Sequence, residues 1–163
     1  MNRKLRVLFV SGENSCRSQM AEGWMRVLAG KRVTVRSAGV KAGVVHPLAV
    51  EVMSEKGVDI GSLRSKAVLD LEAVTFDVVV TLCGSAEDYC TSFTDPTSGT
   101  TSDRVAVLGG TPHRLHWAID DPAKSPGNLV AFRVARDEIQ RHIKAMLDHG
   151  YLSALTEERE RRD

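Results

Sequence analysis

The sequence lacks the features that mark a partner of nucleic acids or membranes. Its 22 basic and 21 acidic residues leave a formal net charge of +1, so no overall field would attract a polyanion or an anionic lipid surface. No apolar stretch approaches the roughly 20 residues that span a bilayer. The first apolar run stops at Ser11 with no small-residue cleavage site after it, which argues against a signal peptide. We therefore expect a cytoplasmic protein that binds neither nucleic acid nor membranes.

Cysteines are also few, and their number is odd. Cys16, Cys83 and Cys90 cannot form a disulfide framework, and in a chain without an export signal they indicate redox or catalytic thiols. Their spacing is not that of a zinc site, so we predict no metal ion and no other cofactor. No surface pattern demands self-association, and we expect a monomer.

The length and composition indicate one domain. At 163 residues, with 42% hydrophobic side chains, the chain can bury one good core and is too short for two. We predict a domain over residues 1–150 and a charged tail over 151–163. Residues 91–115, rich in Thr, Ser, Gly and Asp, are predicted to form a surface insertion that contains the strand-like stretch Val105–Leu108.

Hydrophobic periodicity predicts alternating strands and helices. Short branched apolar runs predict strands at 5–10, 33–38, 77–82 and 116–119, and spacings of three and four predict helices at 18–30, 47–56 and 128–149. This alternation implies an α/β fold with three layers, α/β/α, around a central, mainly parallel four-stranded sheet. The apolar residues expected on one face of the first helix are Met20, Trp24, Val27 and Leu28. Those expected on one face of the last helix are Val130, Val134, Ile139, Ile143 and Leu147.

The segment between the first strand and the first helix has the composition of an anion site. Residues 11–18 read SGENSCRS and lead into a helix, whose free N–H groups and dipole favour an oxyanion. Arg17 lies six residues after Ser11, placed to fold back and hold two oxygens with its planar guanidinium. On the pattern alone, ordinary helix capping is the alternative.

Three motifs, in the same order, resemble the arsenate reductases of the low-molecular-weight protein tyrosine phosphatase superfamily. They are ENSCRSQMAEGW, TLCGSAEDYC and HWAIDDPA, and the similarity covers most of residues 1–147 apart from the predicted insertion. The family holds its oxyanion in a loop made of a cysteine, five residues and an arginine. The resemblance implies a low-molecular-weight phosphatase-like fold and an oxyanion loop formed by Gly12, Glu13, Asn14, Ser15, Cys16 and Arg17.

Ser11 stands where the family has its nucleophilic cysteine. A thiolate near a helix N-terminus and Arg17 is stabilised and attacks arsenic readily, whereas a serine hydroxyl needs a base, and the loop has no histidine. We interpret Ser11 as a replacement that keeps the shape of the loop and stops turnover; a naturally inactive relative is the alternative. Glu13 should point outward, because a carboxylate facing the anion would weaken its binding. Cys16 matches a family cysteine outside the relay, so we expect a structural role for it.

The resemblance also implies a relay of cysteines that reduces arsenate. The loop thiolate attacks arsenic, Cys83 attacks the loop sulfur and expels arsenite, and Cys90 resolves that bond into a Cys83–Cys90 disulfide, which thioredoxin reduces. The segment between the two cysteines must loop or unwind for their sulfurs to meet. From the residues alone, Cys83 could equally be a buried strand-end thiol and Cys90 a chance surface cysteine.

Two further positions match catalytic residues of the family. Asp121, before Pro122, matches the general acid, which would protonate the hydroxide that leaves arsenic; an ordinary Asp-Pro turn is the alternative. Ser18 would donate a hydrogen bond to a thiolate at position 11, or cap the helix, or do both.

A second set of residues matches the support of the loop. Asn14, Glu22 and Ser37 correspond to residues that support a potassium ion in some members, but Lys66 stands where the fourth ligand, an aspartate, would be. An ammonium can occupy the place of the cation. We therefore predict no potassium requirement and a pair between Lys66 and Glu22, with an exposed Lys66 as the alternative.

The sequence leaves two other functions open. A low-molecular-weight phosphatase would use the same loop and Asp121, but it has no use for a second pair of cysteines. Aromatic side chains that could sandwich a phosphotyrosine ring are also scarce, with only Tyr89 and Tyr151 as tyrosines. A catalytically silent oxyanion-binding or redox-sensing protein would be favoured if Ser11 is the natural residue.

Overall fold

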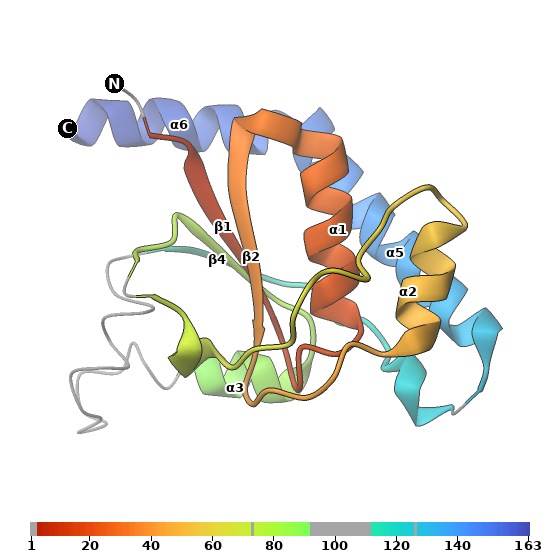
Figure 1. Ribbon diagram of the computed structural model, residues 1–163. Coiled ribbons are helices and arrows are strands. Elements are labelled where there is room, and N and C mark those ends of the chain that lie inside the picture. The colour runs from red at the N-terminus through yellow and green to blue at the C-terminus, as the bar shows by residue number, and fades with distance from the viewer. Residues whose placement is uncertain (1–2, 73, 92–111, 126) are drawn as a thin grey trace.

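The computed structural model, which describes residues 3–72, 74–91, 112–125 and 127–163, is built on a central parallel sheet (Figure 1). Its four strands are β1 (Leu5–Ser11), β2 (Val33–Gly39), β3 (Val78–Thr81) and β4 (His113–His116). They lie in the order β2-β1-β3-β4, and every neighbouring pair is parallel. The predicted α/β fold with a four-stranded, parallel central sheet is confirmed.

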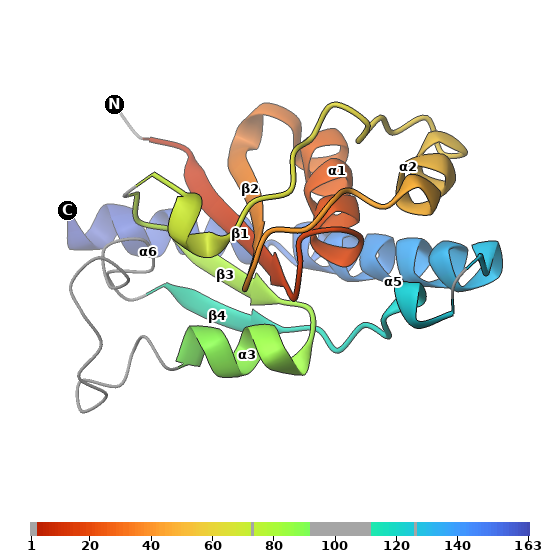
Figure 2. The ribbon, with the colours of Figure 1, turned by 60° about the horizontal axis from the view of Figure 1, so that its bottom comes forward.

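Helices cover both faces of the sheet (Figure 2). One core holds side chains of α1 (Arg17–Ala29), α2 (Pro47–Ser54), α5 (Leu129–Asp148) and α6 (Tyr151–Arg162). The opposite face packs against α3 (Gly84–Thr91) and the short 3₁₀ helix η2 (Val68–Asp70). Because side chains alternate along a strand, Phe9 of β1 lies in the first core and Val10 in the second.

The buried stripe of α5 differs from the predicted one. Val130 and Val134 are 62% and 58% exposed, and Val27 of α1 is also mostly exposed. The residues that α5 buries are instead Phe132, Ala135, Arg136, Ile139, Ile143 and Met146. The predicted face was wrong at its amino-terminal end, because a small alanine and an arginine lie in the contact with the neighbouring helices.

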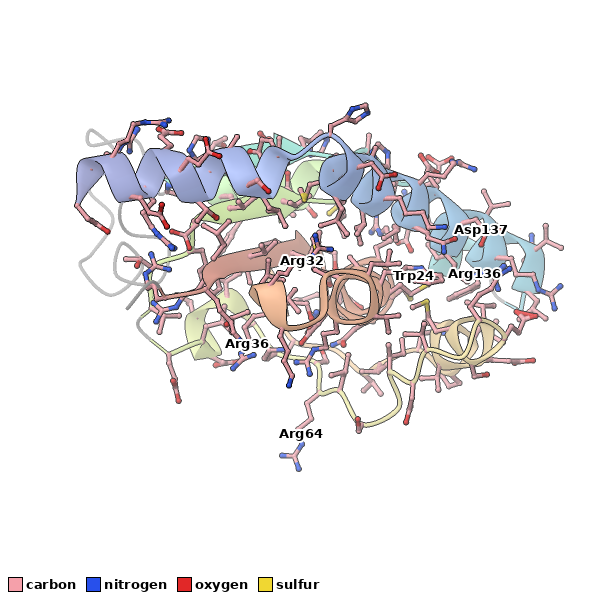
Figure 3. All side chains as sticks on the ribbon, turned by 90° about the horizontal axis from the view of Figure 1, so that it is seen from above. Trp24, Arg32, Arg36, Arg64, Arg136 and Asp137 are labelled. Atoms are coloured by element: carbon pink, nitrogen blue, oxygen red, sulfur yellow. The ribbon has the colours of Figure 1, made fainter. Side chains whose placement is uncertain are left out.

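A buried arginine joins three helices of this core (Figure 3). Arg136 of α5 is 5% exposed, and its Nη1 donates to the carbonyl of Val52 in α2 at 2.9 Å. Its own carbonyl accepts from the indole nitrogen of Trp24 in α1 at 3.1 Å. Glu55 and Asp137 balance the guanidinium charge. Position 136 of α5 therefore contacts α2 through its side chain and α1 through its main-chain carbonyl, and the amino-terminal end of α1 carries the predicted anion loop.

The last strand starts earlier in the chain than predicted. We expected a strand at 116–119, whereas β4 covers 113–116 and lies partly inside the predicted insertion. Its sequence, HRLH, is polar because β4 is an edge strand with partly exposed side chains, so the hydrophobic pattern did not reveal it. Val105–Leu108 and most of the predicted insertion lie outside the described residues.

The segment predicted as a charged tail is mainly the helix α6. Leu152 and Leu155 of this helix are buried in the first core, and Arg159 donates to the carbonyl of Arg3 at 2.6 Å. Both ends of the chain therefore lie at the same edge of the molecule (Figure 1). In the part of the chain that the structure describes, no helix has the length and apolar content needed to cross a membrane.

Candidate active site

The loop between β1 and α1 lies at the carboxyl end of a central strand. Ser11 is 2% exposed, and its Oγ lies 2.6 Å from the Oγ of Ser18 in the first turn of α1. The carbonyls of Ser11, Gly12 and Ser15 accept hydrogen bonds from backbone N–H groups of residues 40, 41 and 46. In each of these peptide units the N–H, which belongs to the next residue, points the opposite way, because the C=O and N–H groups of a planar trans peptide are antiparallel. The loop thus turns N–H groups away from residues 40–46.

Asn14 holds the shape of this loop. Its backbone is left-handed, with φ of 52°, and its side chain is fully buried. The Nδ2 group donates to the hydroxyls of Ser18 at 2.8 Å and Ser37 at 3.0 Å. Gly39 passes so close that a Cβ there would lie 2.7 Å from the Asn14 nitrogen, so only glycine fits. The hydroxyl at position 18, and through it Ser11, is therefore held by a rigid polar network.

A buried carboxylate forms the far end of that network. Glu22 is 1% exposed, accepts a hydrogen bond from Ser37, and pairs with Arg26 at 2.5 Å. The Nζ of Lys66 lies 3.9 Å from Glu22, at the outer limit of an ion pair. Burial lowers the pKa of Lys66, and the charge of Glu22 opposes that change. The structure thus brings together all four residues predicted to support the loop, because the backbone N–H of Lys66 also donates to Oδ1 of Asn14 at 3.0 Å.

Arg17 reaches across the mouth of the loop to the segment that follows β4. Its Nη1 donates to the carbonyl of Ile119 at 2.9 Å, and its Nη2 lies 3.5 Å from Oδ2 of Asp121. Asp121 also caps the short 3₁₀ helix η3 (Pro122–Lys124) by accepting from the nitrogen of Ala123 at 3.0 Å. The structure therefore places Asp121 beside the loop, in a position that suits a general acid and that also serves ordinary capping.

A cavity of about 550 Å³ connects these groups. It is lined by residues from three segments, namely 11–17, 83–85 and 118–124. Glu13 also lines it, but its carboxylate pairs with Lys41 at 3.0 Å and is 52% exposed, so its charge is balanced at the rim. A tetrahedral oxyanion fits this space, and the N-terminus of α1 and Arg17 supply the matching positive potential.

The three cysteines occupy different environments, and all three are free thiols. Cys83 is half-buried, lines the cavity, and has its Sγ 3.3 Å from the hydroxyl of Ser85. Cys90 belongs to the last turn of α3 and faces the second core, 1% exposed, and burial raises the pKa of its thiol to about 12. Cys16 lines the cavity but is 3% exposed, and burial raises its pKa to about 11. The structure therefore brings Cys83 to the anion loop and keeps Cys90 away, so the alternative of a surface position for Cys90 is wrong.

Three residues of the site were not singled out from the sequence. Gln19, 0% exposed, donates to both oxygens of Asn14, and its position inside ENSCRSQMAEGW was the available signal. Ser85 contacts Cys83, and Lys124 adds a positive charge to the cavity wall. Ser85 lies inside TLCGSAEDYC, which was the available signal for it, whereas no motif contains Lys124, which meets the loop only through the fold. Among the described residues, no group of three or more His, Cys, Asp or Glu side chains is placed to hold a metal ion.

Comparison with known proteins identifies the family. The sequence model of the family of low molecular weight phosphotyrosine protein phosphatases matches residues 6–161 of this chain. The chain belongs to this family. An arsenate reductase of Halalkalibacterium halodurans is 40% identical over 92% of this chain and 99% of its own length, and one of Bacillus subtilis is 37% identical over 88% and 96%. The resemblance seen in the three sequence motifs is confirmed.

Solved structures agree with this assignment. An arsenate reductase in a phosphate-binding state superposes with a TM-score of 0.67 at 29% identity, over 89% of this chain and 98% of that protein. A low-molecular-weight tyrosine phosphatase from T. tengcongensis gives 0.65 at 26% identity, over 90% and 99%. The family's phosphatases and reductases therefore share this fold, and the fold alone does not separate the two activities.

Proposed function

We propose that this chain binds arsenate in the loop 11–17 and has the architecture of an arsenate reductase whose first thiol is replaced by Ser11. The observation that carries the proposal is the single cavity that contains Arg17, Cys83 and Asp121. A phosphatase needs only the loop and the acid, whereas a reductase also needs a thiol within reach of the loop. The arsenate reductases among the relatives support the same choice.

In the proposed reaction, two thiols supply the two electrons that convert arsenate to arsenite. With a cysteine at position 11, its sulfur bonds to arsenic while Asp121 protonates the departing hydroxide. Cys83 then attacks that sulfur; the sulfur–arsenic bond breaks, and its electron pair leaves with arsenite. Cys90 attacks Cys83 in turn, which restores the loop thiol and leaves a Cys83–Cys90 disulfide. Thioredoxin is the proposed reductant of that bond.

The serine at position 11 should strongly impair this series of reaction steps. Its hydroxyl is in contact with Ser18, a neutral group, and neither residue can act as a base at neutral pH. Arg17 and the N-terminus of α1 do not depend on the missing thiol, so oxyanion binding should persist. We propose that the protein acts in the cytoplasm, because the proposed relay starts from reduced Cys83 and Cys90. We also propose that it acts as a monomer, as expected from the sequence.

The test is arsenate-dependent oxidation of NADPH in the presence of thioredoxin and thioredoxin reductase. Three forms are compared: the parent chain, Ser11→Cys, and the double variant Ser11→Cys/Cys83→Ser. We expect turnover only in Ser11→Cys. Turnover in the double variant, or hydrolysis of p-nitrophenyl phosphate at a much higher rate than arsenate reduction, would contradict the reductase proposal.

A silent oxyanion-binding or redox-sensing protein is the second candidate, and the hydroxyl at position 11 favours it. Such a protein would use the loop for binding and the Cys83/Cys90 pair for sensing. If Ser11→Cys binds arsenate but does not reduce it, this candidate replaces the first. Phosphate binding by the parent chain, measured calorimetrically, is expected under both.

A further inference from the structure

The helix α3 separates the two cysteines that the proposed function joins. Cys83 directly precedes α3 and Cys90 lies in its last turn, seven positions further along. At 1.5 Å per residue, their Cα atoms are about 10 Å apart along the helix axis. A disulfide requires roughly 4.4–6.8 Å. Any contact that holds α3 in its helical form must therefore oppose the bond.

The first such contact joins the middle of α3 to the ends of two strands. Thr81, the last residue of β3, donates its hydroxyl proton to the carboxylate of Glu87. The same hydroxyl oxygen lies 2.8 Å from Nδ1 of His116, the last residue of β4, which itself is 3.6 Å from the Glu87 carboxylate. Since Thr81 has only one proton, the Nδ1–H form of His116 completes the triangle as donor. Thr81 is 2% exposed, so this contact anchors Glu87 to the rigid interior.

The second contact holds the carboxyl-terminal end of α3. Arg114 of β4 donates its Nη2 to the carbonyl of Cys90 at 2.9 Å. Carbonyls in the last turn of a helix have no partner within the helix, and a guanidinium also balances the negative end of the helix dipole. The two contacts thus hold α3 at its middle and at its carboxyl-terminal end, and both come from β3 and β4. The ribbon shows α3 lying beside these strands (Figure 2).

We infer that Glu87 and Arg114 are positioning residues that keep α3 helical and packed against β3 and β4. In this way they help to set the reduction potential of the Cys83/Cys90 pair. The inference rests on the disulfide of the proposed function and adds what controls it. Both contacts exist only while α3 is helical, so they stabilise the dithiol relative to the disulfide. Removing either one makes the disulfide easier to form.

The measurement uses glutathione buffers, in which glutathione disulfide is the oxidant. Two protein thiols and one glutathione disulfide give one Cys83–Cys90 disulfide and two molecules of glutathione. The full chain is equilibrated without oxygen over a series of buffer ratios. The oxidised fraction is read from the 2 Da mass loss, and a peptide map locates the bond. This reaction does not need a thiol at position 11.

Glu87→Ala is the decisive variant. It is expected to shift the equilibrium towards the disulfide about tenfold, equivalent to about 30 mV for this two-electron couple. Alanine is a better helix former than glutamate, so an effect of helix propensity alone would act in the opposite direction. The matched control is Asp88→Ala, which removes an exposed carboxylate from the next position of the same helix and should leave the equilibrium within about twofold.

Arg114→Met provides an independent test of the other end. It should shift the equilibrium in the same direction as Glu87→Ala. It should also lower the urea midpoint of the reduced protein, while that of the oxidised protein stays close to the parent's, because the contact exists only in the reduced form. Equal equilibrium constants in the parent, Glu87→Ala and Arg114→Met would overturn the inference and leave the proposed disulfide intact. If no buffer ratio gives a Cys83–Cys90 bond in any form, the inference and the relay of the proposed function fail together.

Discussion

Arg17 and Asp121 face each other at the mouth of the cavity, with Nη2 and Oδ2 3.5 Å apart. One belongs to the anion loop at the start of α1 and the other to the segment after β4. Arg17 is fixed in addition by the carbonyl of Ile119, and Asp121 by the nitrogen of Ala123. The group expected to hold the oxyanion and the group expected to donate a proton thus form one structural unit.

The role of Asp121 can be tested in the Ser11→Cys form. Asp121→Asn should lower the rate of arsenate reduction about 10²–10³-fold, because an amide cannot protonate the departing hydroxide. Binding of arsenate should not weaken, since the substitution removes a negative charge from the rim. Asp120→Asn, at the exposed neighbouring position, is the matched control. A normal rate in Asp121→Asn would leave Asp121 with its capping role only.

Arg17 should dominate oxyanion affinity in the parent chain. Arg17→Lys is expected to weaken phosphate binding at least about tenfold, because a lysine cannot bind two oxygens with a planar fork. Titration calorimetry with inorganic phosphate measures the effect without turnover. Arg64→Lys is the control, since the side chain of Arg64 extends away from the rest of the molecule (Figure 3). Equal phosphate affinities in the parent and Arg17→Lys would mean that the planar guanidinium of Arg17 does not hold the anion.

The strand, loop and helix around residues 11–17 could be predicted from the sequence because their determinants are local. A branched apolar strand, a turn-rich stretch and a helix with a three-and-four spacing lie next to each other between residues 5 and 30. The structure has β1 and α1 in those places, and Gly30 after α1 has the positive φ of a helix end. The position of Cys83 at a strand end could be predicted for the same reason.

Features that depend on distant contacts could not be predicted. The position of β4 was not predicted, because its sequence HRLH is polar and becomes a strand only through its pairing with β3. The buried face of α5 depends on Arg136, whose partners Val52 and Trp24 lie in other helices. Leu152 and Leu155 are too few to mark α6 as packed when charged residues surround them.

Lys66 should make the protein independent of potassium. Lys66→Met leaves buried Glu22 without its nearby ammonium and should lower the free energy of unfolding by about 1–2 kcal/mol. Potassium chloride, compared with choline chloride at equal ionic strength, should restore part of this loss and should not affect the parent. Lys41→Met, which removes an exposed lysine paired with Glu13, serves as the control. A potassium-dependent gain in the parent would refute the prediction.

The thiols should react in a fixed order. Burial raises the pKa of Cys16 to about 11 and that of Cys90 to about 12, so at pH 8 their thiolate fractions are about 10⁻³ and 10⁻⁴. Cys83 is half-buried and lines the cavity. Ellman's reagent should therefore label one thiol quickly and two slowly in the native chain. Cys83→Ser should abolish the fast phase, whereas a fast phase that survives this substitution would assign reactivity to another cysteine.

Cys90 should also make stability depend on alkaline pH. The fold favours its neutral thiol, so this contribution is fully present below the unfolded pKa of about 9 and is lost as pH rises towards about 12. Between pH 9 and 10 the free energy of unfolding of the parent should fall by roughly 1 kcal/mol more than that of Cys90→Ala, which has no thiol to ionise at this position. Urea unfolding at a series of pH values measures the difference, with Cys83→Ala as the control that keeps the buried thiol. Parallel curves for the parent and Cys90→Ala would show that Cys90 ionises as easily in the folded chain as in the unfolded one, which its burial on the core-facing side of α3 argues against.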